Sequence, residues 1–154
     1  MMVRHFTASA IVVQEDLKRV LLVHHNKIGK WLYPGGHVEP NQTPAETAIR
    51  EVEEETGIRT RVLADTRSHH PSVTRHPMPF AIIEVTADDR DGLGLHHHID
   101  FVYVLRAVST DIRIELDEVG LARWVPIDEI SRLDTPPDLP VLIENAIRWA
   151  ETNA

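Results

Sequence analysis

The chain has 154 residues, of which 42% are apolar and 26% are charged, proportions that are typical of a folded globular protein rather than a disordered one. Its 24 acidic residues exceed its 16 basic residues, and the resulting net charge of −8 argues against a general nucleic-acid or anionic-membrane binder, because such proteins present a basic face. The lack of cysteine excludes disulfides, thiolate metal sites and a cysteine nucleophile.

No secretory leader is expected, because residues 1–10 have scattered polar side chains and no long apolar core. No apolar run approaches the roughly 18 residues that a membrane helix needs. We therefore expect a cytoplasmic protein that forms one domain over residues 1–154 and has neither a nucleic-acid polymer nor a membrane as its partner.

The first part of the chain predicts three strands. Residues 6–13 and 20–23 are apolar and β-branched, and the polar residues 14–19 between them predict a hairpin connection. A third extended segment, residues 30–33, ends at the break Pro34-Gly35-Gly36.

The clearest helix is predicted over residues 43–56. Thr43 has the position of an N-cap, Pro44 that of the first helical residue, and Gly57 that of the C-terminal stop. Apolar side chains recur at helical spacing and predict a buried stripe, which consists of Ala45, Ala48, Ile49 and Val52.

The second half of the chain predicts further strands and a terminal helix. Strands are expected at residues 58–64, 80–86, 97–107 and 122–125, a helical turn at 127–131 and an amphipathic helix around 142–150. Both faces of residues 97–107 are largely apolar, which predicts a central strand that is covered on two sides. The order of elements indicates an α/β fold of the α+β type, with a mixed β-sheet sandwiched between helices.

Much of the acidic charge lies in one segment, since residues 39–55 contain six glutamates and one arginine. Glu51, Glu54 and Glu55 stand at i, i+3 and i+4 and therefore share one helical face. Such carboxylates repel one another unless a cation lies between them. Arg50 can neutralise one of them, and a hard divalent cation such as Mg²⁺ or Mn²⁺ could neutralise two.

Taken alone, an acidic helical turn is more often a solvated surface. Two features favour a ligand-binding or metal-binding site instead. The acidic face adjoins the apolar stripe, and Gly35 and Gly36 precede the helix closely, so that the backbone can approach a ligand or a metal.

The spacing of residues around this helix matches a known pattern. The pattern is Gly, five residues, Glu, seven residues, Arg-Glu-apolar, one residue, Glu-Glu, one residue, Gly-apolar. The matching residues are Gly36, Arg50, Glu51, Val52, Glu54, Glu55, Gly57 and Ile58. In this arrangement the segment resembles the signature box of the Nudix hydrolases. One position departs, because Gln42 replaces the usual glutamate; glutamine can accept a hydrogen bond from Arg50 but supplies no charge.

The resemblance implies a pyrophosphohydrolase that depends on a divalent metal and cleaves a phosphoanhydride bond in a nucleoside diphosphate linked to another group. The implied cofactor is Mg²⁺, with Mn²⁺ as an alternative. The implied metal ligands are Glu51, Glu54, Glu55 and the carbonyl of Gly36, and the implied Nudix-like fold is the mixed sheet already expected. A homodimer is an alternative to a monomer, because dimers are common in the family.

The catalytic residues expected from the resemblance are Glu54, Arg50 and Glu51. Arg50 would orient the carboxylates through charge-assisted hydrogen bonds. Glu54 is the candidate general base, and Asp117 and Glu118 are alternatives outside the box.

Contacts to the substrate are weakly indicated by the sequence. Tyr33 could stack on a base, and His37 and Arg67 could contact phosphate. Arg4, Arg75 and Arg106 could do the same, although each of these cations is more often an ordinary solvated side chain. Residues 69–79 and 86–98 are the expected specificity loops.

The chain also has ten histidines, and three of them are consecutive. His96, His97 and His98 cannot all face one way on a strand, because neighbouring side chains alternate. A zinc site would need convergent partners, for which His69, His70 and His76 are the candidates; no spacing matches a structural zinc pattern. A position beside the substrate pocket and a plain surface position are the other interpretations.

Two other functions remain open from the sequence. One is a catalytically weak or inactive nucleotide-binding or sensor module of the same fold, for which Gln42 is the supporting feature. The other is an acidic scaffold, which divalent metal would not stabilise against heat. The sequence does not choose among ADP-ribose, dinucleoside polyphosphates, damaged nucleoside triphosphates and a non-nucleotide diphosphate.

Overall fold

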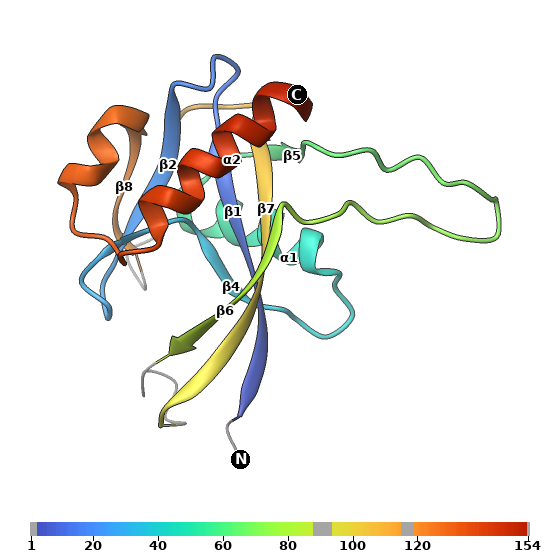
Figure 1. The fold of residues 1–154 in the computed structure, drawn as a ribbon, viewed down its shortest axis with the longest axis horizontal. Helices are drawn as coiled ribbons and strands as arrows, with labels where there is room; N and C mark the ends of the chain where they lie inside the picture. Colours follow the sequence, from blue (N-terminus) through green and yellow to red (C-terminus); the bar gives the residue numbers. More distant parts are fainter. Residues whose placement is uncertain (1–2, 88–93, 115–118, 154) are drawn as a thin grey trace.

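The computed structural model describes residues 3–87, 94–114 and 119–153. Within these ranges a mixed sheet of eight strands lies between two α-helices (Figure 1). The elements are β1 (Arg4–Val13), β2 (Arg19–His25), β3 (Trp31–Leu32), β4 (Gly35–His37), α1 (Pro44–Thr56), β5 (Thr60–Val62), β6 (Ala81–Ala87), β7 (His96–Ala107), β8 (Val119–Pro126), the 3₁₀-helix η2 (Ile127–Arg132) and α2 (Leu139–Asn153).

The sheet is organised around β1 and β7, which lie side by side. Its main path runs β3-β2-β1-β7-β5, while β4 pairs with β1, β6 with β7 and β8 with β2. β1 and β7 are parallel over ten register pairs, from Arg4↔His97 to Val13↔Arg106, whereas the other strand pairs are antiparallel. The predicted mixed sheet is therefore confirmed.

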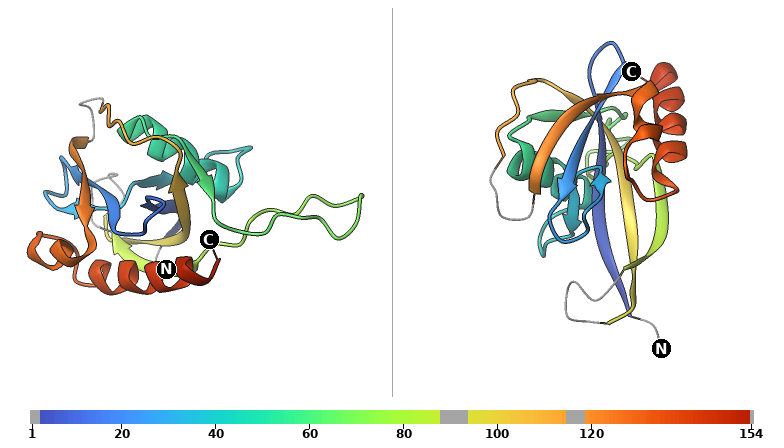
Figure 2. Two further views of the ribbon diagram at one scale, coloured as in Figure 1. Left: turned by 90° about the horizontal axis from the view of Figure 1, so that it is seen from above. Right: turned by 90° about the vertical axis from the view of Figure 1, so that its left-hand side faces the viewer.

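Each face of the sheet packs against one helix, as Figure 2 shows. On the α2 face, alternate residues of the central strands such as Ile11 and Val102 form a buried cluster with Ile143. On the α1 face, the intervening residues such as Val12 form a second cluster with Val52. This alternation confirms that β7 is a central strand covered on both sides.

The predicted break at Pro34-Gly35-Gly36 is wrong in part, because Gly35–His37 forms the short strand β4. A Cβ at Gly35 would lie 2.4 Å from the Ser9 hydroxyl oxygen and 2.8 Å from the Ala8 carbonyl oxygen. Gly35 thus allows a closer approach to β1 than a residue with a side chain could make, which is why a glycine pair that usually interrupts a strand belongs to one here.

α1 begins and ends as its sequence predicts. The Thr43 side chain accepts a hydrogen bond of 3.2 Å from the backbone N–H of Glu46, and Pro44 occupies the first turn. Gly57 has φ 74° and donates its N–H to the Glu53 carbonyl. The caps fix the length of the helix and therefore the position of its acidic last turns.

α2 covers the opposite face and has 15 residues. Its buried residues include Ile143, Ala146 and Ala150, at the spacing of an amphipathic helix. Neither α2 nor any other described helix combines the length and the apolar character that crossing a bilayer requires.

Replacing Gly57 by alanine should destabilise the protein more than the same change at Gly29. Both glycines have positive φ, 74° and 70°, so both variants carry similar backbone strain. A Cβ at Gly57 would also lie 3.1 Å from Arg113, whose backbone N–H is bonded to the Thr56 carbonyl, whereas Gly29 has nothing within 4 Å. In urea denaturation we expect the free energy of unfolding to fall by about 1 kcal/mol for Gly29→Ala and by about 2 kcal/mol or more for Gly57→Ala. Equal losses would show that the Arg113 contact has no energetic effect.

Candidate functional site

The acidic face of α1 is organised by Arg50. Its Nη2 lies 3.1 Å from Glu51 Oε1, and its Nη1 donates to both carboxylate oxygens of Glu54 at 3.1 and 3.0 Å. A longer ion pair of 3.8 Å joins it to Glu39. Three carboxylates thus share one guanidinium, and this neighbourhood keeps an excess of negative charge that would attract a cation.

The environment of Arg50 keeps it charged. Burial lowers the pKa of Arg50, but the hydrogen bond with Glu54 and the charges of Glu51, Glu54 and Glu39 raise it by more, so that the net shift is upward. The guanidinium therefore acts as a permanent clamp that orients the carboxylates.

Gln42 holds the other side of this guanidinium. Its Oε1 accepts hydrogen bonds from Arg50 Nε at 3.1 Å and from Thr47 Oγ1 at 3.0 Å. The expectation that glutamine can still accept a bond from Arg50 is confirmed. The departure from the family pattern removes a charge from the site but keeps the contact that positions Arg50.

Glu51 lies directly against the backbone of β4. A Cβ at Gly36 would be 2.5 Å from Glu51 Oε1, so a side chain at position 36 would displace this carboxylate. The Glu51 side chain is 14% exposed, whereas that of Glu54 is 58% exposed. Carboxylate oxygens beside a glycine backbone form an oxygen-rich donor set, the chemistry that Mg²⁺ and Mn²⁺ prefer, and the residues present therefore fit such an ion.

A cavity of about 1070 Å³ opens beside this turn. Its lining includes the predicted metal ligands Gly36 and Glu55 and the predicted substrate contacts Tyr33 and His37. The segment before α2 contributes Pro136 and Asp138 to the lining, and α2 itself contributes Leu139 and Asn145. The place of the proline-rich segment before α2 in this wall depends on how α2 packs on the sheet.

Another polar group lines the cavity from the sheet, and the sequence interpretation did not include it. Asp100 of β7 is 5% exposed and accepts hydrogen bonds from the hydroxyls of Ser9, at 2.8 and 2.9 Å, and of Thr7, at 3.0 Å. Burial raises the pKa of Asp100, and the bonds from Ser9 and Thr7 oppose this shift only partly. The available signal was a carboxylate within an otherwise apolar central strand.

Tyr33 provides a donor in the same cavity. Burial raises the pKa of its phenol, and the charges of Asp100 and Asp138 raise it further. The hydroxyl therefore stays protonated at neutral pH. It can donate a hydrogen bond to a bound ligand, and the ring can contact an aromatic base.

Arg67 lies elsewhere. Its guanidinium forms two hydrogen bonds with Asp65, at 3.0 and 2.9 Å, and its side chain is 89% exposed. These bonds lower the pKa of the Asp65 carboxyl. The connection between β5 and β6 that carries both residues projects away from the sheet (Figure 1), and none of the described cavity-lining residues comes from its segment 64–80.

Other residues singled out from the sequence have different surroundings. Arg4 pairs with Glu84 at 3.1 Å, and Arg75 forms a longer ion pair of 4.0 Å with Asp65. Thr86 and His98, which flank one expected specificity loop, line the cavity. Residues 88–93 of that loop lie outside the described residues, as do the candidate bases Asp117 and Glu118.

Comparison with solved structures agrees with this architecture. A Nudix-family hydrolase from Clostridium perfringens superposes with a TM-score of 0.77 at 26% sequence identity, over 96% of this chain and 99% of that one. A Nudix hydrolase from Nitrosomonas europaea superposes with a TM-score of 0.69, also at 26% identity, over 96% of this chain and 91% of that one.

Sequence comparison gives the family. A CMP-5'-(N-acetyl-N-hydroxy-3-aminopropyl)phosphonate hydrolase from Streptomyces rubellomurinus is 31% identical over 82% of this chain, which spans 54% of that protein's length. Three further relatives are matched over 36–52% of their length. The family model described as the NUDIX domain matches residues 3–146 of this chain. The chain therefore belongs to the Nudix family.

Proposed function

We propose that this chain hydrolyses a phosphoanhydride bond in a nucleoside diphosphate linked to another group, in a reaction that depends on Mg²⁺ or Mn²⁺. The observation that carries the proposal is the turn of α1 on which Arg50 joins Glu51 and Glu54, beside the Gly36 backbone and a cavity lined by Glu55. Family membership and the hydrolase names among its relatives support it.

Each residue of the turn has a role in the proposed reaction. Glu51, Glu54, Glu55 and the Gly36 carbonyl would hold the metal, and Arg50 would keep the carboxylates in place. Bound Mg²⁺ would neutralise charge on the phosphate oxygens and orient a water. Glu54, which is more exposed than Glu51, would accept the proton from that water as the new P–O bond forms and the anhydride bond breaks.

The part of the cavity lined by Asp100 and Tyr33 would bind the group attached to the diphosphate. Asp100 accepts bonds from Ser9 and Thr7, and Tyr33 supplies a protonated phenol. A ligand bound there could donate hydrogen bonds to the Asp100 carboxylate and accept one from the Tyr33 hydroxyl. These interactions suit the hydroxyl and amino groups of a nucleoside or sugar. His37 lines the same cavity and would contact the phosphates.

Removing the base should abolish most turnover without unfolding the protein. We expect Glu54→Gln to lower kcat by about 100-fold or more, because the neutral amide cannot take a proton. The assay measures release of phosphate or nucleoside monophosphate in the presence of Mg²⁺ and, separately, of Mn²⁺. The substrates are ADP-ribose, a dinucleoside polyphosphate, an oxidised nucleoside triphosphate, a CMP-linked phosphonate and a non-nucleotide diphosphate.

Glu53→Gln is the matched control for this variant. Glu53 is an exposed neighbour on the same helix but off the shared face, so its replacement should leave kcat unchanged. Lack of turnover by the wild-type chain on every substrate would contradict the proposal. Nucleotide binding in calorimetry without hydrolysis would then favour the sensor module.

Divalent metal should stabilise the fold through the same carboxylates. Saturating Mg²⁺ should raise the melting temperature of the wild-type chain, by linkage of binding to folding, with about 2.7 kcal/mol expected at a hundredfold excess over Kd. Glu51→Gln should reduce this shift, while Glu53→Gln should keep it. An equal shift in both variants would contradict the proposed ligand set, and no shift in the wild type would favour an acidic scaffold.

Gln42 should matter as an acceptor rather than as a charge. Gln42→Leu removes the partner of Arg50 Nε and Thr47 Oγ1, and we expect it to lower the free energy of unfolding by about 1–3 kcal/mol and kcat several-fold. Gln42→Glu keeps the acceptor and should retain wild-type kcat or exceed it. If the leucine variant matched the wild type in both measurements, Gln42 would not position Arg50.

A further inference from the structure

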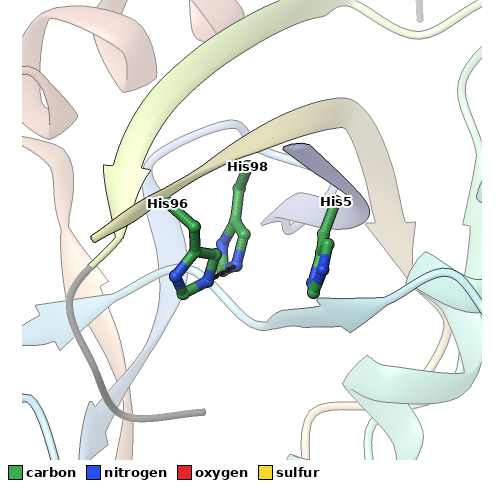
Figure 3. A group of neighbouring side chains, drawn as sticks. All are labelled: His5, His96 and His98. Atoms are coloured by element: carbon green, nitrogen blue, oxygen red, sulfur yellow. Dashed lines mark hydrogen bonds between the residues drawn. The ribbon is translucent and has the colours of Figure 1, made fainter. Parts of the chain in front are cut away.

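Three histidines converge near the ends of β1 and β7, as Figure 3 shows. One ligand nitrogen from each of His5, His96 and His98 lies within 4.8 Å of the other two. The closest pair is His96 Nε2 and His98 Nε2, which are 3.2 Å apart. The convergence is unexpected from the sequence, where His5 is distant and isolated.

Strand geometry explains why these rings meet. His96 and His98 are two residues apart in β7 and therefore project from the same face of the sheet, while His97 projects from the other face and contacts Glu84. His5 is the register partner of His98 across the parallel β1–β7 ladder. The partner of the histidine run is thus His5 and not a residue of the 69–79 loop.

The hydrogen bonding of His96 prepares it as a ligand. Its side chain is fully buried, and its Nδ1 lies 2.8 Å from the Gly94 carbonyl oxygen. Because a carbonyl can only accept, Nδ1 carries the proton, and in a neutral ring Nε2 then presents a lone pair toward His98. A backbone carbonyl that fixes the tautomer in this way is the usual support of a metal-binding histidine.

The spacing also suits a small ion. A tetrahedral site with metal–nitrogen bonds of about 2.0–2.1 Å separates its ligand nitrogens by about 3.3–3.4 Å. The His96–His98 separation of 3.2 Å is close to that value, and in the absence of an ion it allows an N–H···N hydrogen bond. Bringing His5 to the same spacing requires a shift of about 1.5 Å or less, within the reach of a side-chain rotation.

We propose that His5, His96 and His98 form a second metal site, for a borderline divalent transition ion such as Zn²⁺. Imidazole nitrogens suit such ions, whereas Mg²⁺ prefers the carboxylate oxygens of α1, so the two sites differ in the ion that they select. His98 lines the cavity together with His37, whose ring centroid is 5.3 Å from that of His98. The ion therefore borders the cavity, from which water or an anionic oxygen of a ligand would supply a fourth donor.

The test is a direct measurement of metal binding, independent of catalysis. Tag-free full chain, stripped of metal with a chelator, is titrated with Zn²⁺ by calorimetry in excess Mg²⁺, which occupies the carboxylates. We expect one Zn²⁺ per chain, and Co²⁺ in its place should give the visible absorption of tetrahedral nitrogen ligation. His98→Ala and His5→Ala should each weaken binding by at least about 100-fold.

Two controls locate the ion. His76→Ala removes an exposed histidine of the β5–β6 connection and should leave Zn²⁺ affinity unchanged. Glu51→Gln should do so as well, because it affects only the carboxylates. His5 and His98 are preferred to the fully buried His96 as targets, and circular dichroism checks that each variant is folded.

Three results would overturn the proposal. They are no Zn²⁺ binding in excess Mg²⁺, unchanged affinity in the folded His5 and His98 variants, and loss of binding in His76→Ala. The last result would assign the ion to the β5–β6 connection.

Discussion

The parallel pairing of β1 with β7 determines how the sheet packs against the two helices. It also determines where the polar side chains of these two strands lie. Ten register pairs hold the strands, and both faces of the pair are covered by helices, so a slip of one residue would turn each set of side chains toward the wrong helix. The same register places Thr7 opposite Asp100 and His5 opposite His98. The rigid, two-sided burial of these strands is therefore what allows a polar group to persist within the core.

Two kinds of metal-ligating side chain, carboxylates and imidazoles, lie on different elements of this protein. On α1 the carboxylates of Glu51 and Glu54 are held by Arg50 and remain in excess over it. Near the beginning of β1 and of β7, His5, His96 and His98 contribute imidazoles. Glu55 of α1 and His98 of β7 both line the cavity, so carboxylate oxygens and imidazole nitrogens border the same space. Under the proposed function, bound cations would change the sign of the surface that a polyanionic substrate meets, so that a net acidic protein could bind it.

The substitution at position 42 shows which property of the site is retained. Gln42 supplies no charge, yet its carbonyl oxygen accepts bonds from Arg50 and Thr47. The guanidinium consequently keeps a neutral partner on one side and carboxylates on the other. Fewer negative charges then compete for Arg50, and its interaction with Glu51 and Glu54 does not depend on a glutamate at position 42.

The sequence by itself determined the features that depend on local pattern: the capped helix α1, the apolar alternation of β7 and the acidic face with Arg50 among its glutamates. Spacing along one element is enough to assign these, because the helical and strand periods decide which side chains share a face. The tertiary structure alone decided that Gly35–His37 pairs with β1, that Ser9 bonds Asp100 from 91 residues away, and that His5 joins His98. These contacts depend on strand order and register, which are set by the collective burial of two faces rather than by any short segment.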